Sequence, residues 1–525
     1  MNYTRIYKGI LGFASAAVLV GCSDSFLEQD PLSFYEPEAT YSTESGLQAA
    51  LAVCDRHLRY MYTNGNHNNA PIASDYIFSD MALYGKTDAG AGDLMDNLAD
   101  KIQPTSGMLN GGDGNYYMYF WNESFNGIKY ANTVLSYIDK VTTLSDEVKN
   151  IYKGRAYFHR AIKYYHMGFW FGDLPLITRI IDGPKQNYKS TKKEAILEML
   201  VKDLEFAVQH VPSQSEMSTY GMVNKEACLH LLTKCYLATG EYAKAEATAT
   251  DLIDNYGLEL MKEPFGTNVE GGNPATWPIK RNVIWDLHRA ENKIGAFNKE
   301  CIMGIPNMST QALIEFTAMR IFGPFWNGNI KDPSGKGTTR FSRQDGKYDP
   351  TCSWVEVLGR GIATMRLSDF AQKNLWVVNG EMDRQDLRHN SECGNWVNMT
   401  DITYNDPSSE WFGKNLMLYH PETGALLCTD TIRSWFDHPL YKVYYTDETA
   451  NANMGANEWR GATKGSNGNL YLFRLAETYL LRAEAKLYQG RAADAAKDVN
   501  EVRQRANAKH MYNVVNIGDI ANERG

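Results

Sequence analysis

Apolar residues recur at three- and four-residue steps in several segments of the chain, and this spacing places them on one face of an α-helix. Segment 192–211 shows it most clearly, because its apolar stripe runs through Ile196, Leu200, Leu204 and Val208. Proline cannot donate the backbone hydrogen bond that a helix needs, so Pro212 marks the end of this helix. The same spacing predicts further helices over residues 115–138, 151–171, 224–239, 242–256, 470–488 and 492–507.

The last four of these predicted helices form two pairs, and each pair has a glycine at its turn, Gly240 in the first and Gly490 in the second. Both pairs carry alanines at matching positions, such as Ala227 and Ala476. Small side chains let two helices approach closely, and glycine permits the tight turn between them. The pattern is typical of tetratricopeptide-like repeats, whose helix pairs stack on one another. Two ordinary helical hairpins would show the same spacing and remain the alternative.

Residues 257–469 have a different character, because glycine, asparagine, aspartate, proline and tryptophan become frequent and helical periodicity is patchy. Stretches such as 271–274 and 331–335 have the composition of loops. One short strand is predicted over residues 442–445. The chain is therefore predicted to be mainly α-helical, with tetratricopeptide-like helical repeats and a large irregular, loop-rich insert.

The first 21 residues predict a signal peptide. Arg5 and Lys8 precede an apolar run over residues 10–20, which is too short to span a bilayer, where about 20 apolar residues are needed. The run ends in Leu-Val-Gly-Cys, which resembles the bacterial lipobox, so Cys22 is the predicted lipidation site. Acyl chains on this cysteine would anchor the protein to a membrane. A plain secretory signal with a chance cysteine is the alternative.

Five segments are expected from these changes along the chain. Residues 1–21 are the lipoprotein signal peptide, residues 22–40 are a polar and acidic tether, and residues 41–256 are an N-terminal helical region with tetratricopeptide-like units. Residues 257–469 are the irregular, tryptophan-rich insert that would bind the ligand. Residues 470–525 are the C-terminal tetratricopeptide-like helices.

The formal net charge of −9 argues against nucleic acid as a partner, because phosphate binding needs a basic surface. The cysteines other than Cys22 are scattered, and Cys228 and Cys235, seven residues apart on one helical face, are expected to be buried free thiols. The sequence motifs of zinc proteases, P-loop nucleotide-binding proteins and serine hydrolases do not occur in it. No catalytic residue, metal or cofactor is therefore predicted.

Charged residues of the predicted helices are expected to act structurally. Those in segment 470–488 have spacings that allow ion pairs along one helix face, namely Arg474, Glu477, Arg482 and Glu484. Arg155, Arg160 and Asp173 are assigned the same kind of role, because buried arginine–carboxylate pairs fix the geometry between helices.

Five passages of the sequence, taken in their order along the chain, together resemble a known protein family. They are the lipobox with segment 22–27, Trp121 with segment 127–132, segment 155–176, the Asp-Leu-Arg element at 386–388, and segments 471–485 and 499–506. In these passages the sequence resembles the SusD/RagB family of outer-membrane nutrient-binding lipoproteins of Bacteroidetes. The acidic residues after Cys22 also resemble the surface-export signal of Bacteroidetes lipoproteins.

The resemblance implies a SusD-like helical protein at the surface of the outer membrane, held by the lipid on Cys22. It implies an oligosaccharide or polysaccharide ligand and a partner, a SusC-like TonB-dependent outer-membrane transporter that the lipoprotein caps like a lid. Members of the family continue past a segment like 522–525 into another helix. The present chain is therefore expected to be truncated or to lack that closing helix.

Tryptophans of the insert are the candidate ligand-binding residues. A sugar ring has an apolar face that a flat aromatic ring can cover, and amides or charged groups nearby can satisfy its hydroxyl rim. The predicted ligand-binding residues are Trp277, Trp326, Asn327, Asn329, Trp354, Asn395, Trp396 and Trp411. For any single tryptophan, packing in the core is the alternative.

The leading hypothesis is a surface glycan-binding lipoprotein that captures oligosaccharides and delivers them to the transporter. The alternative is a structural or interaction lipoprotein that docks the transporter without binding sugar itself. A surface glycosidase with a pair of carboxylates is a third class, for which the sequence offers no positive support.

Overall fold

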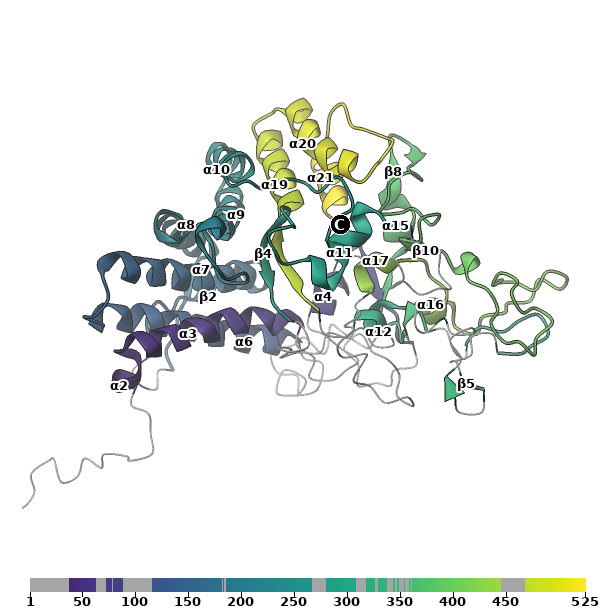
Figure 1. Ribbon diagram of the computed structural model, residues 1–525, viewed down its shortest axis with the longest axis horizontal. Helices are drawn as coiled ribbons and strands as arrows, with labels where there is room; N and C mark the ends of the chain where they lie inside the picture. The colour runs from purple at the N-terminus through teal and green to yellow at the C-terminus, as the bar shows by residue number, and fades with distance from the viewer. Residues whose placement is uncertain are drawn as a thin grey trace, which may run out of the picture.

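The computed structural model describes residues 37–62, 72–77, 79–87, 116–181, 183, 186–266, 280–307, 318–325, 329–337, 343–344, 347–348, 354, 358–359, 361–444 and 468–525. The predicted signal peptide, Cys22 and most of the predicted tether lie outside these residues. The long helices occupy the left and upper parts of the molecule in Figure 1, and the short elements of the insert occupy its right part.

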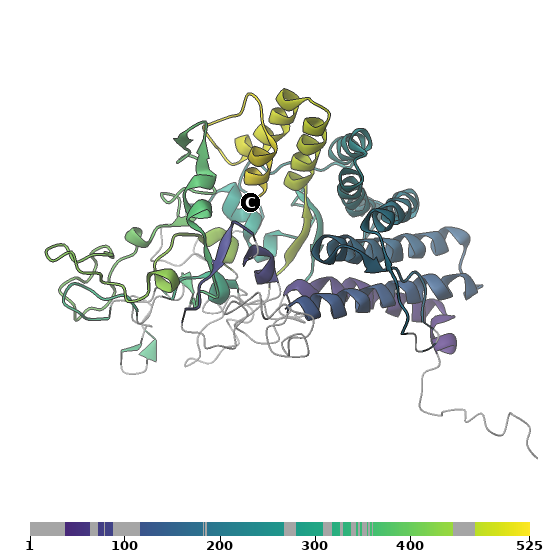
Figure 2. The same ribbon diagram turned by 180° about the vertical axis from the view of Figure 1, so that it is seen from behind.

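Eight helices form a stack in which each helix packs against the next member of the set along the chain. They are α3 (Glu44–His57), α6 (Tyr116–Tyr137), α7 (Asp146–Phe171), α8 (Lys193–His210), α9 (Lys225–Ala238), α10 (Tyr242–Asn255), α19 (Leu475–Tyr488) and α20 (Ala492–Arg505). Seen from behind in Figure 2, the stack again runs from α3 and α6 at one end to α19 and α20 at the other. The helices predicted from apolar spacing are confirmed, with ends that agree within a few residues except at two N-termini.

Side chains at the helix ends explain where these helices begin and stop. Ser145 caps α7 by accepting a hydrogen bond from the backbone N–H of Val148, and Asn224 caps α9 by accepting one from Ala227 at 2.8 Å. Such caps satisfy N–H groups that have no partner inside the helix. Helix α7 ends at Gly172, whose φ of +78° is a conformation that glycine adopts without strain.

The two glycine-centred helix pairs pack against each other although the whole insert separates them in the sequence. Gly240 and Gly490 have φ values of +77° and +78° at the two turns. Helix α10 packs on α19, and the rings of Tyr242 and Tyr488 stack with centroids 4.8 Å apart beside the turns. Both helices carry buried alanines, including Ala245 of α10, which has no exposed surface. This close packing is what the tetratricopeptide-like pattern predicted.

Short elements make up the remainder of the described chain. The helices among them are α2 (Pro37–Tyr41), α4 (Ile72–Ile77), α11 (Val283–His288), α12 (Ala318–Phe322), α15 (Asp369–Gln372), α16 (Thr431–Ser434), α17 (Leu440–Val443) and α21 (Ile517–Arg524). The strands form antiparallel pairs, which are β1 (Ala82–Tyr84) with β7 (Met365–Leu367), β2 (Leu174–Pro175) with β3 (Ser190–Thr191), β4 (Cys301–Ile305) with β12 (Leu470–Arg474), β5 (Arg343–Gln344) with β6 (Lys347–Tyr348), β8 (Val377–Val378) with β9 (Glu381–Met382), and β10 (Trp396–Val397) with β11 (His438–Pro439).

Two predicted elements were wrong in part or in full. The first five residues of segment 470–488 form strand β12 instead of helix, because strand β4, distant in sequence, supplies their backbone hydrogen bonds. Residues 442–444 do not form the strand predicted over 442–445, since α17 occupies residues up to Val443, and residue 445 lies outside the described residues. Short apolar runs do not distinguish strand from helix by periodicity, and the tertiary partner decides.

The insert has a hydrophobic core of its own beside the core of the helical stack. The large core of the stack includes Phe158, Leu200 and Leu231, and the second core includes Trp285 and Leu440. Cys228 and Cys235 are free thiols without exposed surface in the first core, as predicted. The insert is thus a folded part of the molecule with buried apolar side chains.

The four charged residues of segment 470–488 whose spacing allows ion pairs along one helix face instead form ion pairs with residues of other elements. The closest contacts are Arg474–Glu300 at 3.1 Å, Glu477–Lys234 at 2.7 Å, Arg482–Asp498 at 2.8 Å and Glu484–Arg524 at 2.9 Å. The prediction that they pair along one helix face is therefore wrong. Their role is to join elements that are distant in sequence.

Helix α7 carries a second set of such contacts. Arg155 contacts Asp55 of α3 at 2.6 Å, and Arg160 contacts Asp203 of α8 through two bonds of 2.6 Å and 3.0 Å to one carboxylate oxygen. Arg160 and Asp203 are both buried. Asp173 pairs with Lys192 near the surface.

Among the helices that the structure describes, none combines the length and the apolar composition that crossing a membrane requires.

We predict that Asp203→Ala lowers the free energy of unfolding by about 3–5 kcal/mol, because it leaves the buried Arg160 guanidinium without its carboxylate. Chemical denaturation followed by circular dichroism measures the change. Asp139→Ala is the matched control, since Asp139 pairs with Lys153 at 2.7 Å but is largely exposed. Equal losses in the two variants would contradict the assigned role of the buried pair.

We also predict that acid destabilises the protein through His438, which burial keeps neutral. Burial lowers the pKa of His438 to about 3, whereas an unfolded histidine has a pKa of about 6.5. Between these values the unfolded chain binds more protons, so stability falls as the pH drops below about 6.5. His438→Gln removes this titration, and its unfolding free energy should fall less steeply, by about 1.4 kcal/mol per pH unit. Denaturation at several pH values tests this, and identical slopes would refute it.

Candidate functional site

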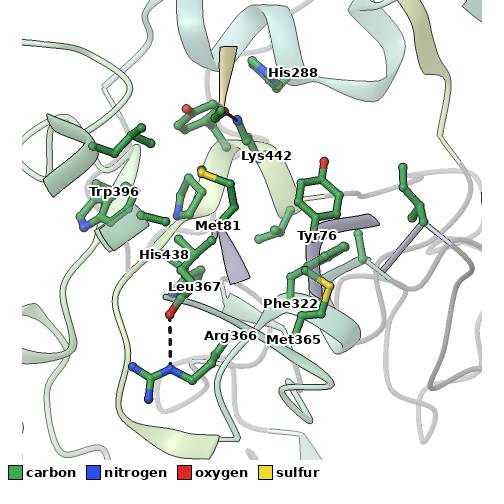
Figure 3. Close-up of a pocket in the computed structure, with 18 of the residues that line it drawn as sticks. Tyr76, Met81, His288, Phe322, Met365, Arg366, Leu367, Trp396, His438 and Lys442 are labelled. Carbon is green, nitrogen blue, oxygen red and sulfur yellow. Dashed lines mark hydrogen bonds between the residues drawn. The ribbon is translucent and has the colours of Figure 1, made fainter. Parts of the chain in front are cut away.

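A cavity of about 350 Å³ lies between strand β12 and elements of the insert (Figure 3). Its walls come from α4, strand β7, α12, the β10–β11 pair, α17 and the residues around Arg474. These elements are spread over most of the chain, so only the folded molecule brings them together. Cavities of this size and of mixed lining are the usual binding sites for small ligands.

One end of the cavity is apolar. Figure 3 shows Tyr76, Phe322, Met365 and Leu367 near one another around it, and all four line it. Tyr76 and Phe322 meet edge to face with ring centroids 6.1 Å apart. Strand β7 carries Met365 and Leu367, and its register opposite β1 fixes them at the cavity wall.

The indole rings of Trp376 and Trp396 line another part of the cavity, and His389 packs against both rings. His389 stacks on Trp376 with centroids 4.7 Å apart and lies 4.4 Å from the ring of Trp396. The indole N–H of Trp376 donates to the carbonyl of Ala371 at 2.9 Å, which fixes the ring. Burial lowers the pKa of His389 to about 4, so its imidazole is neutral at physiological pH.

A second space of about 360 Å³ adjoins the cavity and is lined by charged residues of both signs, including Glu477 and Glu523. Residues that line both spaces include His288, Tyr441, Lys442, Tyr471 and Arg474. The second space is bordered further by basic residues of the insert and of the C-terminal helices, which are Arg388, Arg503, Arg505 and Arg524.

Burial, with a smaller contribution from nearby positive charge, lowers the pKa of two lysines that line the cavity. The surrounding protein desolvates the ammonium of Lys442 and lowers its pKa to about 8, and the guanidinium groups of Arg474 and Arg388 act in the same direction. Burial also lowers the pKa of Lys293 to about 7. Both lysines are easier to deprotonate because desolvation and nearby positive charge disfavour the ammonium form.

Most of the arginines that line the second space form ion pairs with carboxylates. Glu300 contacts Arg505 at 2.7 Å and Arg474 at 3.1 Å, so two guanidinium groups share one carboxylate. Arg388 is held between Asp386 at 2.6 Å and Glu523 at 2.5 Å. The Asp-Leu-Arg element at 386–388 is therefore part of an ion-pair network with helix α21.

The structure places the predicted ligand-binding residues in different surroundings. Trp277, Trp326 and Asn327 lie outside the described residues. Asn395 has no exposed surface, and its side-chain amide donates to Asn282 and to the carbonyl of Leu387, so it joins backbone segments of the insert.

Trp396 is 2% exposed overall, and it lines the apolar cavity through the small surface that remains accessible. Asn329 lies elsewhere and donates to the hydroxyl of Ser434 at 2.8 Å.

Trp354 and Trp411 lie beside one segment, residues 402–429, which we call the arm. The indole N–H of Trp354 donates to the carbonyl of Thr403 at 2.8 Å, and Trp411 itself belongs to the arm. Both rings are partly exposed and pack against the core of the insert. The structure thus brings these two tryptophans to one segment and separates them from Asn395 and Trp396.

The arm also carries aromatic residues that the sequence-based prediction omitted. Phe412 is 49% exposed and Tyr419 is 58% exposed, whereas most large side chains of the insert core are buried. Exposed polar residues flank them, including Glu410 and Asn415. Phe412 directly follows Trp411 in a polar loop. This adjacency is a signal in the sequence, and the prediction missed it because it considered only tryptophan among the aromatic residues.

Within the residues that the structure describes, no group of three or more histidine, cysteine, aspartate or glutamate side chains is placed to hold a metal ion.

Comparison with protein-family models gives two matches. Residues 66–237 match the model described as "Starch-binding associating with outer membrane", and residues 395–525 match the model described as "SusD family". The matches cover parts of both the helical stack and the insert with the C-terminal helices.

Individual relatives agree with these matches. The chain is 26% identical over 261 residues to the SusD-like protein P2 of Formosa agariphila, which is 49% of this chain and 48% of the relative. The chain aligns with about half of the length of the curated relatives that it matches. These relatives are named as SusD-like proteins and not as enzymes.

Solved structures share the fold over nearly the whole chain. A laminarin-binding SusD-like protein has a TM-score of 0.58 and 17% identity, with 92% of this chain and 88% of that chain covered. Surface glycan-binding protein A from Bacteroides thetaiotaomicron, solved in complex with laminarihexaose, has a TM-score of 0.56 and 16% identity, with coverage of 92% and 86%. The helical repeats and the insert are therefore arranged as in SusD-like proteins, and the chain belongs to the SusD/RagB family.

Proposed function

We propose that the chain is a cell-surface glycan-binding lipoprotein that captures oligosaccharides and delivers them to a TonB-dependent outer-membrane transporter. The observation that carries the proposal is the arm, which presents Trp411, Phe412 and Tyr419 among exposed polar side chains on a SusD-like fold. A flat ring covers the apolar face of a sugar, and nearby carboxylates and amides bind its hydroxyl groups.

The geometry of the arm suits a stacking surface. Trp354 is anchored to the carbonyl of Thr403, and backbone hydrogen bonds between Tyr404 and Lys414 and between Ile402 and Leu416 close the arm on itself. Anchored rings lose little conformational freedom on binding, which favours affinity. The ammonium of Lys414 lies over one face of the Trp411 ring, 4.3 Å from its centroid, as a cation–π contact.

The names of the relatives suggest which sugars to test. One structural relative is named as laminarin-binding, another was solved with laminarihexaose, and one matched family model is described as starch-binding. Laminarihexaose and maltohexaose are therefore the first ligands for this chain.

The location and the partner belong to the same proposal. The lipobox at Cys22 supports a lipid anchor, and the description of the matched family model supports association with the outer membrane. A lipid-anchored protein at the cell surface can bind a glycan before it reaches a transporter. We propose the SusC-like transporter as the partner to which the ligand is delivered.

Docking of the transporter without sugar binding is the second candidate. It is favoured by exposed apolar residues on the helical stack, such as Phe169 at 53% and Tyr488 at 47% exposure. A protein with this function would co-purify with the transporter and bind no oligosaccharide in calorimetry. The proposal of glycan binding requires that calorimetry detects binding of an oligosaccharide.

We predict that Phe412→Ala and Tyr419→Ala each weaken binding of the preferred hexaose about fivefold, as expected when one aromatic contact of about 1 kcal/mol is lost. Isothermal titration calorimetry measures the dissociation constants. Tyr188→Ala is the matched control, because Tyr188 is 39% exposed but lies on the helical side of the molecule next to β3. Unchanged affinity in both arm variants would refute the assignment of the arm, and no binding by the unsubstituted chain would favour the docking function.

A further inference from the structure

The arm is attached at two places to a loop that is distant in the sequence, residues 329–337, which we call the bracing loop. The first attachment is made by the backbone. The N–H of Thr429 donates to the carbonyl of Asn329 at 2.8 Å, and the N–H of Lys331 donates to the carbonyl of Leu427 at 2.8 Å. These hydrogen bonds join the end of the arm to the bracing loop.

Tyr419 is connected to this first attachment. It pairs with Leu426 across an antiparallel bridge, and the N–H of Leu427 donates to the carbonyl of Leu418 at 2.8 Å. Leu427 therefore bonds to the segment of Tyr419 on one side and to Lys331 on the other. The position of Tyr419 is thus set through the backbone of the bracing loop.

Phe412 is connected to the second attachment, which is the side chain of Asp332. The hydroxyl of Ser409 donates to one carboxylate oxygen of Asp332, and the two residues are buried, with 6% and 1% of their surface exposed. The same hydroxyl accepts a hydrogen bond from the N–H of Trp411 at 3.1 Å, and the N–H of Phe412 donates to the carbonyl of Ser409 at 3.1 Å. A short path of hydrogen bonds thus leads from Asp332 to the backbone that carries Phe412.

Asp332 is itself held in one orientation. Its other carboxylate oxygen accepts hydrogen bonds from the hydroxyl of Ser334 at 2.7 Å and from the backbone N–H of Lys336 at 2.9 Å. Burial raises the pKa of Asp332, but the hydrogen bonds from Ser409, Ser334 and the backbone outweigh burial and hold the pKa below its ordinary value. The side chain is therefore a carboxylate, and hydrogen bonds to a carboxylate are stronger than those between neutral groups.

We propose that Asp332 is a positioning residue of the glycan-binding arm. Through Ser409 it holds the ring of Phe412 in a fixed place relative to Tyr419, so that one oligosaccharide can contact both rings. The inference rests on the proposed function. The two attachments come from adjacent residues, Lys331 and Asp332, so the bracing loop gives both rings one common reference. Rings that are held in place before binding lose less conformational freedom when the ligand arrives, which favours affinity.

A purely structural role for Asp332 makes a different prediction. If the side chain only stabilised the insert, its loss would add to the loss of either ring. If it acts through Phe412, removing Asp332 and removing Phe412 abolish the same contact with the ligand, whereas the contact with Tyr419 remains. Double variants separate the two roles, because changes that act on one shared contact are not additive and changes that act independently are.

The experiment measures dissociation constants of laminarihexaose and maltohexaose by calorimetry on the whole chain, and the tighter ligand is used for the variants. Asp332→Ala should weaken binding about fivefold, the loss expected for one aromatic contact. Combined with Phe412→Ala it should weaken binding by no more than about fivefold, and combined with Tyr419→Ala by about 25-fold.

The link is also tested from its other side. Ser409→Ala should weaken binding about fivefold, with no further loss when it is combined with Asp332→Ala. The amide of Asp332→Asn can donate to the hydroxyl of Ser409, so this variant should bind more tightly than Asp332→Ala. If Asp332→Ala does not fold, Ser409→Ala takes its place in the same combinations with the two ring variants.

Asp173→Ala is the matched control. Asp173 also accepts hydrogen bonds from a side chain and a backbone N–H, those of Lys192 at 2.7 Å and Lys193 at 3.1 Å, but it lies just beyond the end of α7. This variant should bind the hexaose as the unsubstituted chain does.

Two results overturn this inference and leave the proposed function standing. One is unchanged hexaose affinity in Asp332→Ala. The other is a full fivefold loss that Asp332→Ala adds to Phe412→Ala, because the side chain then acts on something other than that ring. Failure of the unsubstituted chain to bind either hexaose is a distinct result, which refutes the proposed function and this inference with it.

Discussion

Buried ion pairs between the C-terminal helices and the insert are the interaction on which the rest of the structure depends. Glu300 meets Arg474 and Arg505, and Asp383 meets Arg503 at 3.0 Å, so carboxylates of the insert pair with guanidinium groups of β12 and α20. Such pairs add little net stability, yet breaking one leaves a buried charge without compensation. They therefore fix how the insert sits against the last helix pair more than they strengthen it.

The β12–β4 pair and the charged lining of the second space both follow from this arrangement. Glu300 directly precedes β4, and Arg474 ends β12 opposite Cys301, so the strand register and the ion pair specify the same alignment. A slip by one residue would turn every side chain of β12 to the opposite face and separate the charges. Glu300 also holds the guanidinium groups of Arg474 and Arg505, which line the second space. The same contact thus orients the insert and places charged groups in the lining of that space.

The helical stack was predictable from the sequence because its signals are local. The stripe from Ile196 to Val208 lies within one helix, and Gly240 and Gly490 mark turns whose conformation only a few neighbours determine. Strand β12 was not predictable in this way, because its partner β4 is distant in the sequence and its own apolar residues fit a helix equally well. The partner of Arg482 was missed for the same reason, since the carboxylate that it contacts belongs to Asp498 on the next helix.

The tryptophans of the insert show where composition stops being informative about the site. Trp396 and Trp411 both occur in polar, asparagine- or glycine-containing segments, and the sequence-based prediction treated them alike. Trp396 lies on β10, whose pairing with β11 buries it against His389, whereas Trp411 lies on the arm, which is held at the edge of the insert core. The elements that pack over a large aromatic ring decide whether the ring is buried. The residues next to it in the sequence carry no information about that packing. The cavity depends even more on tertiary structure, because its lining runs from Tyr62 to Gly525 and only the folded chain brings those segments together.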